Sequence, residues 1–392
     1  MTEPVLTATV HESTASIPEE TWNGLVPGRS GVPDNPFLDH RFLLALERSG
    51  SATARTGWQP QHILLTKDDG SAVGLMPLYA KSHSQGEYVF DYAWADAYER
   101  AGGAYYPKLQ SAVPFTPVTA PKLLVPSGNP AERRALLQAA EALAGRHGIA
   151  TVHATFVPED EAALASATGW LHRTDTQFHW HNDGFSSFEG FLDTLASRKR
   201  KMLRRERRDA LEDGLEVKWL TGSDLTEAVW DAFYAFYMDT GSRKWGRPYL
   251  NRKFFSLLSE AMADRVVLMF AYDGDEPIAG TLNLLGRDTL YGRYWGATRD
   301  VPFLHFELCY YQSIDYAIAH GLARVEAGAQ GEHKLARGYA PATTHSIHWI
   351  GHEGLRHAVD NFLDHERAAV VRQQEMLDGL TPFRKGERLD HD

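Results

Sequence analysis

The chain has 392 residues, of which 43% are hydrophobic and 23% charged, with a formal net charge of −11 and one cysteine. This length suits two domains, and the composition is that of a soluble globular protein. The acidic balance argues against bulk affinity for nucleic acids or anionic membranes, and a single cysteine excludes a disulfide framework and a cysteine-based zinc site. The N-terminus lacks a signal-peptide pattern and no stretch is long and apolar enough for a membrane helix, so we expect a cytoplasmic protein.

Two hairpin patterns recur along the chain. Residues 62–66 and 72–80 flank an Asp-Asp-Gly turn, and residues 266–272 and 278–285 flank an Asp-Gly-Asp turn. Each pattern predicts a β-hairpin. We interpret the pair as a faint internal duplication of one α/β unit, which predicts domains over 1–185 and 186–392.

Between these patterns, two segments are rich in aromatic residues. They cover 88–98 and 105–117 and contain Asp91 and Lys108. One interpretation is a strand with aromatic packing followed by a proline-fixed loop. The other is the wall of a ligand site, because large aromatic patches at a surface usually serve binding.

The next segment covers residues 188–214, and its pattern predicts one amphipathic, strongly basic helix. Arg198 and Lys199 fall within its apolar stripe, so they are expected to face the protein body and to need an anionic partner there. A solvated basic face is the alternative for the rest of the run, which comprises Arg198, Lys199, Arg200, Lys201, Arg204, Arg205, Arg207 and Arg208.

The next features lie in the second half of the chain. A loop around Trp245 reads as a lid or as an anchored surface loop. In the strand predicted over 290–297, Tyr291, Arg293 and Trp295 are expected on one face. A helix over 303–320 places Glu307 and Tyr310 on its packed stripe, where Glu307 serves either a salt bridge or a ligand.

The densest group of functional side chains comes at the end of a predicted strand over 323–330. An acid, an imidazole and two cations at the carboxyl end of a strand form a set that could remove a proton and hold an anion. An ion-pair network without catalysis is the alternative. The residues are Glu326, Gln330, Glu332, His333, Lys334 and Arg337.

Other chemistries fit less well. No nucleophile elbow, P-loop, dinucleotide fingerprint or zinc-protease motif occurs. His179 and His181 share one face of a predicted strand, but no third ligand is identifiable, so no metal site is predicted.

These segments together resemble the FemAB-like family of predicted N-acyltransferases in the GNAT superfamily, which includes peptidoglycan-biosynthesis-like proteins. The resemblance spans nearly the whole chain, from Asn35 to the final helix predicted over 354–380. It rests on the motifs GEYVFD at 86–91, YPKL at 106–109, PFTP at 114–117, SRKR at 197–200 and EAGAQGEHKLARG at 326–338.

The resemblance implies an α/β fold with mixed sheets, arranged as tandem acetyltransferase-like domains with a cleft between them. The second would carry the basic linking helix and the C-terminal helix. Acyl-CoA is an implied donor, yet residues 296–302 depart from the pyrophosphate-loop pattern and residues 98–110 do not supply it. The related Fem ligases use aminoacyl-tRNA instead, but their helical-hairpin arm has no obvious counterpart here.

We therefore expect an enzyme that transfers an acyl or aminoacyl group to an amine of a small molecule or peptide, without a metal. His333 or Glu326 is the predicted base, with Glu332 orienting it. The remaining predicted binding residues are Arg198, Lys199, Lys334, Arg337, Gln330, Trp295, Arg293, Glu307, Tyr310, Trp245, Asp91 and Lys108.

Two alternatives stay open. A non-catalytic member of the fold would keep a ligand site without the donor loop. A Fem-type enzyme would bind tRNA through the basic helix, with affinity that falls steeply with salt.

Overall fold

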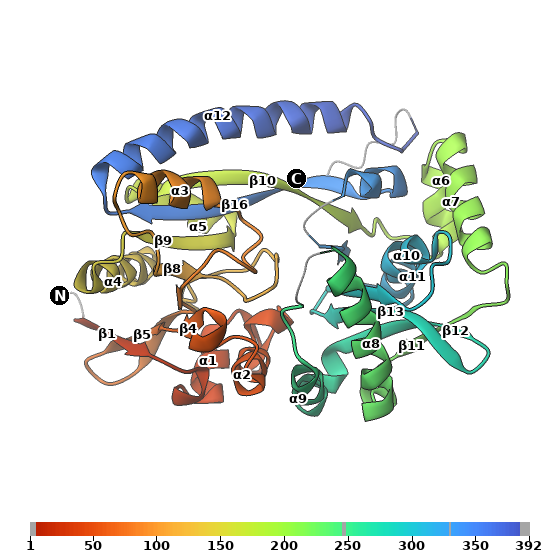
Figure 1. The fold of residues 1–392 in the computed structure, drawn as a ribbon, viewed down its shortest axis with the longest axis horizontal. Helices are drawn as coiled ribbons and strands as arrows, with labels where there is room; N and C mark the ends of the chain where they lie inside the picture. Colours follow the sequence, from red (N-terminus) through yellow and green to blue (C-terminus); the bar gives the residue numbers. More distant parts are fainter. Residues whose placement is uncertain (1–4, 245–247, 329–330, 385–392) are drawn as a thin grey trace. The chain divides into compact units, whose positions relative to one another are not determined.

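The computed structural model describes residues 5–244, 248–328 and 331–384 (Figure 1). Its mixed α/β architecture confirms the expected fold class. The chain divides into two compact units, unit 1 with residues 1–175 and 343–372, and unit 2 with residues 176–342 and 373–392. The expected division at 185/186 assumed contiguous domains, whereas residues 343–372 return to unit 1.

In its described residues, unit 1 contains a two-stranded sheet, β2 (Gly28–Arg29) with β3 (Val32–Pro33), and two larger groups of paired strands. The smaller of these two groups has the strand order β1-β5-β6, and within this unit the larger runs β16-β9-β8-β7-β4. β8 and β9 pair in parallel, whereas β1–β5, β5–β6, β4–β7, β7–β8 and β9–β16 pair antiparallel. The main elements are β1 (Leu6–His11), α1 (Glu19–Leu25), α2 (His40–Ser49), β4 (Trp58–Pro60), β5 (His62–Lys67), β6 (Ala72–Met76), β7 (Tyr79–Lys81), α3 (Tyr92–Arg100), β8 (Lys108–Ser111), α4 (Pro130–His147), β9 (Thr151–Val157) and α5 (Glu159–Ala167).

The strands of unit 2 form a sheet in the order β11-β12-β13-β14-β15-β10, and helices pack against these strands. Figure 1 shows α8 and α11 beside these strands. Its elements are α6 (Phe188–Thr194), α7 (Ser197–Ala210), β11 (Glu216–Leu220), α8 (Glu227–Lys244), α9 (Arg252–Met262), β12 (Val266–Asp273), β13 (Glu276–Leu285), β14 (Thr289–Ala297), α10 (Leu304–Phe306), α11 (Gln312–Ala319) and β15 (Arg324–Glu326). Three long elements cross the unit boundary, namely β10 (Leu171–His181), β16 (Ala340–Ile350) and α12 (Glu353–Asp378).

The two predicted hairpins are confirmed as β5–β6 and β12–β13. The strand expected over 72–80 is interrupted after Met76 and resumes at Tyr79. Pro77 explains the break, because a proline has no N–H to donate to a sheet.

Several predicted elements differ from the observed ones. The helix over 188–214 is two helices, since Leu195 bridges to Phe383 and Ala196 donates its N–H to the carbonyl of Pro382. Residues 88–98 hold α3 rather than a strand, because aromatic residues favour strands only weakly and context overrides them. The strand over 323–330 is assigned only to Arg324–Glu326.

In the part of the chain that the structure describes, we find no helix with both the length and the apolarity to cross a bilayer.

Candidate active site

β14 and β15 run together at first and then part. They pair in parallel from Thr289 with Arg324 to Tyr291 with Glu326. β15 ends at Glu326, whereas β14 continues to Ala297 with β13 along its other edge. Among the described strands, none therefore covers the second edge of β14 beyond Tyr291.

A pocket of about 110 Å³ lies where these strands part. Pockets that enclose whole ligands usually measure about 300–1,000 Å³, so this one suits a reacting group. We call it the splay pocket. It is lined by Thr281, Gly292, Arg293, Tyr294, Trp295, His305, Cys309, Tyr310 and Ala327.

A β-bulge at Arg293 decides which side chains of β14 share a face. Leu282 pairs with Tyr294 and Asn283 with Gly292, so Arg293 is an extra residue in β14. Alternation is reset beyond it, and Trp295 shares a face with Gly292. The prediction that Tyr291, Arg293 and Trp295 share one face is therefore wrong, because simple alternation does not anticipate an inserted residue.

Gly292 keeps the parting of the strands open. A β-carbon at this position would lie 3.3 Å from Asn283 Oδ1 and 3.6 Å from Ala327 Cα. The first distance is tight, so even a methyl group would press on its neighbours and narrow the splay pocket.

Tyr310 connects the splay pocket to His333. It lies in a π-helical turn over Glu307–Tyr311, a feature that is frequent at functional sites. Its hydroxyl is 2.8 Å from His333 Nε2. Burial raises the pKa of Tyr310, so the hydroxyl stays protonated at neutral pH. The His333 ring also contacts the rings of His305 and Phe306.

Glu326 is buried at the end of β15, with 6% of its surface exposed. Burial raises the pKa of its carboxyl to about 7, against the opposing attraction of Arg324 and Arg293. Arg324 Nε lies 3.1 Å from this carboxyl, and His179 Nε2 lies 4.0 Å away. Burial lowers the pKa of His179 to about 3, which leaves that imidazole neutral. A carboxyl that titrates near neutrality is suited to accept a proton.

Lys334 and Arg337 lie in the 3-10 helix Glu332–Arg337, with both side chains buried. Lys334 Nζ donates to the carbonyl of Gly328 at 2.9 Å, and burial lowers its pKa to about 8. Arg337 Nη1 donates to the carbonyl of His333 at 2.8 Å, and Nη2 contacts the Glu206 carboxylate at 2.8 Å. Arg337 thus positions the turn that carries His333, in place of the ligand contact predicted for it.

The basic run of α7 meets carboxylates from several segments. Arg207 lies 2.9 Å from Glu307, and burial raises the pKa of that carboxyl despite the arginine. Glu307 therefore serves the salt bridge, the first of its two interpretations. Further pairs join Arg207 to Asp315, Arg204 to Glu189, Arg205 and Arg208 to Asp209, and Arg200 to Asp193.

The two cations expected to face the protein body behave differently. Arg198 is exposed and Lys199 is half-buried, so the expectation is wrong for Arg198. The chain turns at Leu195, and the helical phase of α6 does not carry over into α7. The buried residues of α7 are Leu203, Glu206 and Ala210.

In unit 1, Asp91 and Lys108 contact each other. Lys108 Nζ lies 2.5 Å from Asp91 Oδ2, 2.6 Å from Glu87 Oε2 and 2.7 Å from Ser84 Oγ. All four residues are buried. This favours the packed interior over the ligand wall for the aromatic segments.

Three predicted site groups lie outside the described parts of the structure. They are Trp245, Gln330 and the side chain of Glu332.

The segment after β14 does not fit the pyrophosphate of acyl-CoA. The N–H and hydroxyl of Thr298 both donate to the carbonyl of Ile278, at 2.9 and 3.2 Å, and Arg299 pairs with Asp273. These groups are therefore engaged within the protein. Within the described ranges, no group of three or more His, Cys, Asp or Glu residues is placed to hold a metal ion.

His305, Thr281 and Cys309 line the splay pocket although the sequence did not assign them to a site. His305 and Tyr310 are five positions apart, a spacing that α-helical periodicity does not put on one face. Thr281 gave a weaker signal, as a polar residue within an apolar strand.

The chain matches the FemAB-like family over residues 13–385, and the description of that family is peptidoglycan biosynthesis/recognition. No curated protein matches the sequence. Among solved structures, FemX is similar over 90% of this chain and 100% of its own, with a TM-score of 0.54 and 13% identity. A conserved protein of unknown function from Bacteroides thetaiotaomicron VPI-5482 is similar over 87% of this chain and 99% of its own, with a TM-score of 0.50 and 12% identity. These likenesses concern the fold, and the match over nearly the full length shows that the chain belongs to the FemAB-like family.

Proposed function

We propose that this protein is an N-acyltransferase that moves an acyl or aminoacyl group onto an amine, and that the reacting groups meet in the splay pocket. The observation that carries the proposal is the parting of β14 and β15 beside the Tyr310–His333 hydrogen bond. Acyl transfer needs an oriented carbonyl and a base near the attacking amine. The splay pocket and the hydroxyl–imidazole pair beside it are placed to supply both.

The reaction forms a C–N bond and breaks the bond between the acyl carbon and the donor's oxygen or sulfur. Tyr310 takes a proton from the attacking amine and passes its own to His333 Nε2. His333 then returns that proton to the leaving oxygen or sulfur. Glu326 is the second candidate acceptor, because its pKa of about 7 suits proton transfer near neutrality.

The tetrahedral intermediate carries negative charge on the former carbonyl oxygen. Preorganised donors aimed at that oxygen stabilise it most effectively in a site that excludes water. Arg293 lines the splay pocket, and its positive charge is the candidate for this role.

The donor class follows from the segment after β14. Because Thr298 and Arg299 are engaged within the protein, we place aminoacyl esters and other small acyl donors ahead of acyl-CoA. The acceptor would be an amine on a peptide or small molecule, in keeping with the description of the family.

The test begins with thermal unfolding in the presence of acetyl-CoA, an aminoacyl-tRNA or soluble peptidoglycan fragments. A ligand at a hundred times its dissociation constant adds about 2.7 kcal/mol to stability. Stabilisation by a donor supports the enzyme. Stabilisation by fragments alone supports a non-catalytic binding protein.

Transfer of labelled acyl group to fragment amines is then compared among His333→Ala, Glu326→Ala and wild type. His365→Ala is the matched control, since His365 is exposed on α12 and bonds within its own helix. We expect a large loss for His333→Ala and none for the control. Wild-type rates in both His333→Ala and Glu326→Ala would refute the site assignment.

A further inference from the structure

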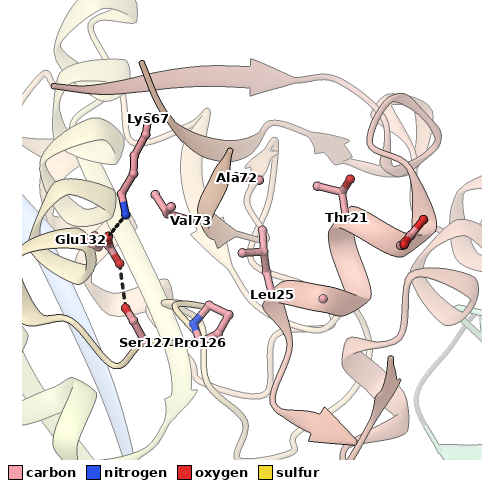
Figure 2. Close-up of a pocket in the computed structure, with 10 residues that line it drawn as sticks. Thr21, Leu25, Lys67, Ala72, Val73, Pro126, Ser127 and Glu132 are labelled. Carbon is pink, nitrogen blue, oxygen red and sulfur yellow. Dashed lines mark hydrogen bonds and ion pairs between the residues drawn. The ribbon is translucent and has the colours of Figure 1, made fainter. Parts of the chain in front are cut away.

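A larger pocket lies in unit 1, and none of the residues assigned above lines it. Its volume is about 410 Å³, within the range of about 300–1,000 Å³ typical of small-ligand sites. Figure 2 shows the residues that line this pocket. We call it the hairpin pocket, because β5 and β6 supply one of its walls. The lining residues are Glu20, Thr21, Gly24, Leu25, Lys67, Ala72, Val73, Pro126, Ser127 and Glu132.

The hairpin pocket exists because a strand pairing stops early. Leu75 and Leu124 exchange backbone hydrogen bonds of 2.9 Å, as adjacent strands do. Two residues further, Pro126 has no N–H to continue the pairing, and β6 carries a bulge at Val73. Val73 and Pro126 therefore become walls of an open space.

One end of the hairpin pocket is polar and held in place. Glu132 is 6% exposed, and its carboxylate accepts a hydrogen bond of 2.8 Å from Ser127 Oγ. Lys67 Nζ lies 3.4 Å from the same carboxylate (Figure 2). An ammonium donor thus lies beside a carboxylate acceptor. An amide group has the complementary pair, a carbonyl that accepts and an N–H that donates.

The rest of the hairpin pocket is mainly apolar. Figure 2 shows Val73, Ala72 and Leu25 between Lys67 at one end and Thr21 at the other. Small aliphatic side chains would bury apolar surface against this wall. Glu20 and Thr21 of α1 add polar groups to the lining.

We infer that the hairpin pocket binds a short peptide segment with small aliphatic side chains, with one of its amides held between Lys67 and Glu132. The inference concerns unit 1 alone and does not depend on the transfer reaction proposed for unit 2. The polar pair supplies the amide recognition and the apolar wall supplies the side-chain preference.

The test is an NMR titration of the full chain with N-acetyl-trialanine amide, which has amides and methyl groups but no charge. Methyl signals of Leu25 and Val73 report occupancy. The filling variant is Gly24→Phe, because Gly24 lines the pocket and a β-carbon there meets nothing within 4 Å. Gly145→Phe is its matched control, an exposed glycine of α4 with equally open surroundings.

We expect saturable shifts in wild type and Gly145→Phe, and a dissociation constant at least about tenfold higher in Gly24→Phe. Lys67→Met should weaken binding in the same direction by removing the donor. Absence of shifts in wild type, or equal binding by Gly24→Phe, would refute the inference. Binding of N-acetylglucosamine in place of the peptide would overturn the ligand class.

Discussion

Two buried charged residues in unit 1, which form a close ion pair, and two in unit 2 show opposite electrostatics. In unit 1, burial would neutralise Asp91 and Lys108, but at 2.5 Å their attraction outweighs it, so the pKa of Asp91 falls to about 2 and that of Lys108 rises. In unit 2, burial outweighs the nearby charges. The pKa of Glu326 rises to about 7, and that of Lys334 falls to about 8.

The opposite pKa shifts distinguish charged residues that stabilise the folded state from charged residues that destabilise it. A close pair is stabilised in its ionised form, whereas strongly perturbed groups beside a pocket are typical of functional sites. Two neighbours of the Asp91–Lys108 pair behave differently from it. Burial lowers the pKa of Lys81 to about 7 and raises the pKa of Glu87. The contrast therefore concerns Asp91 and Lys108 themselves.

The largest expected effect is that of Lys108→Met. This change leaves Asp91 and Glu87 buried without their main cation, and such losses cost about 3–5 kcal/mol. Urea unfolding at pH 7 measures the change. Lys334→Met is the matched control, because its ammonium is already disfavoured by burial, and it should cost much less. Equal losses of unfolding free energy in Lys108→Met and Lys334→Met would contradict the proposed difference between the two units.

Glu326→Gln should stabilise the protein at high pH. A raised pKa means that the folded state holds the proton more tightly than the unfolded chain, whose value is 4.5. Glu326 therefore weakens the fold progressively between pH 4.5 and about 7. The variant should gain about 3 kcal/mol at pH 8 and little at pH 4, by urea unfolding.

The same variant sharpens the functional side of the comparison. If Glu326 accepts a proton in the reaction, Glu326→Gln loses transfer while it gains stability. An equal stability difference at pH 4 and pH 8 would show that the carboxyl is not desolvated as described.

Tyr310→Phe should have a smaller effect on stability and a clear one on chemistry. Loss of the hydroxyl bonded to His333 costs about 1 kcal/mol in unfolding free energy. Loss of a proton relay slows transfer by about a hundredfold or more. Tyr272→Phe, in the same unit and outside the splay pocket, should leave the rate unchanged. A wild-type rate in Tyr310→Phe would exclude the relay.

The smallest effect is expected for Arg204→Ala. Its ion pair with Glu189 is exposed, so the midpoint of urea unfolding should not move measurably. If the donor is an aminoacyl-tRNA bound along α7, the same variant weakens binding and makes it less salt-dependent. Unchanged tRNA binding would leave the helix a structural element with internally paired charges.

Prediction from the sequence succeeded for elements whose residue pattern lies entirely within a short, continuous segment. The β5–β6 and β12–β13 hairpins were found because turn chemistry and alternation lie in adjacent residues. It also placed Glu326 and His333 in one polar segment, and the structure puts both in unit 2. Tyr310 was assigned to the same site and bonds to His333.

The rest depends on single-residue insertions and distant partners. The bulge at Arg293 and the π-helical turn at Tyr310 each insert one residue, and each changes which side chains meet. Part of the balance for the basic run of α7 comes from carboxylates as distant in the sequence as Glu307, which a count of charges within the predicted helix does not include. Glu189, Asp193 and Asp209 lie within residues 188–214 themselves.

The interrupted sequence of unit 1 has a consequence for synthesis on the ribosome. Residues 1–175 emerge first, but the segment that completes the unit, 343–372, follows only after residues 176–342 of unit 2. At about 5–20 residues per second, that interval lasts roughly ten to thirty seconds. Throughout it β9 lacks β16, its antiparallel neighbour, and presents a bare edge to other nascent chains. Newly made protein should therefore depend on chaperones more than its finished stability suggests.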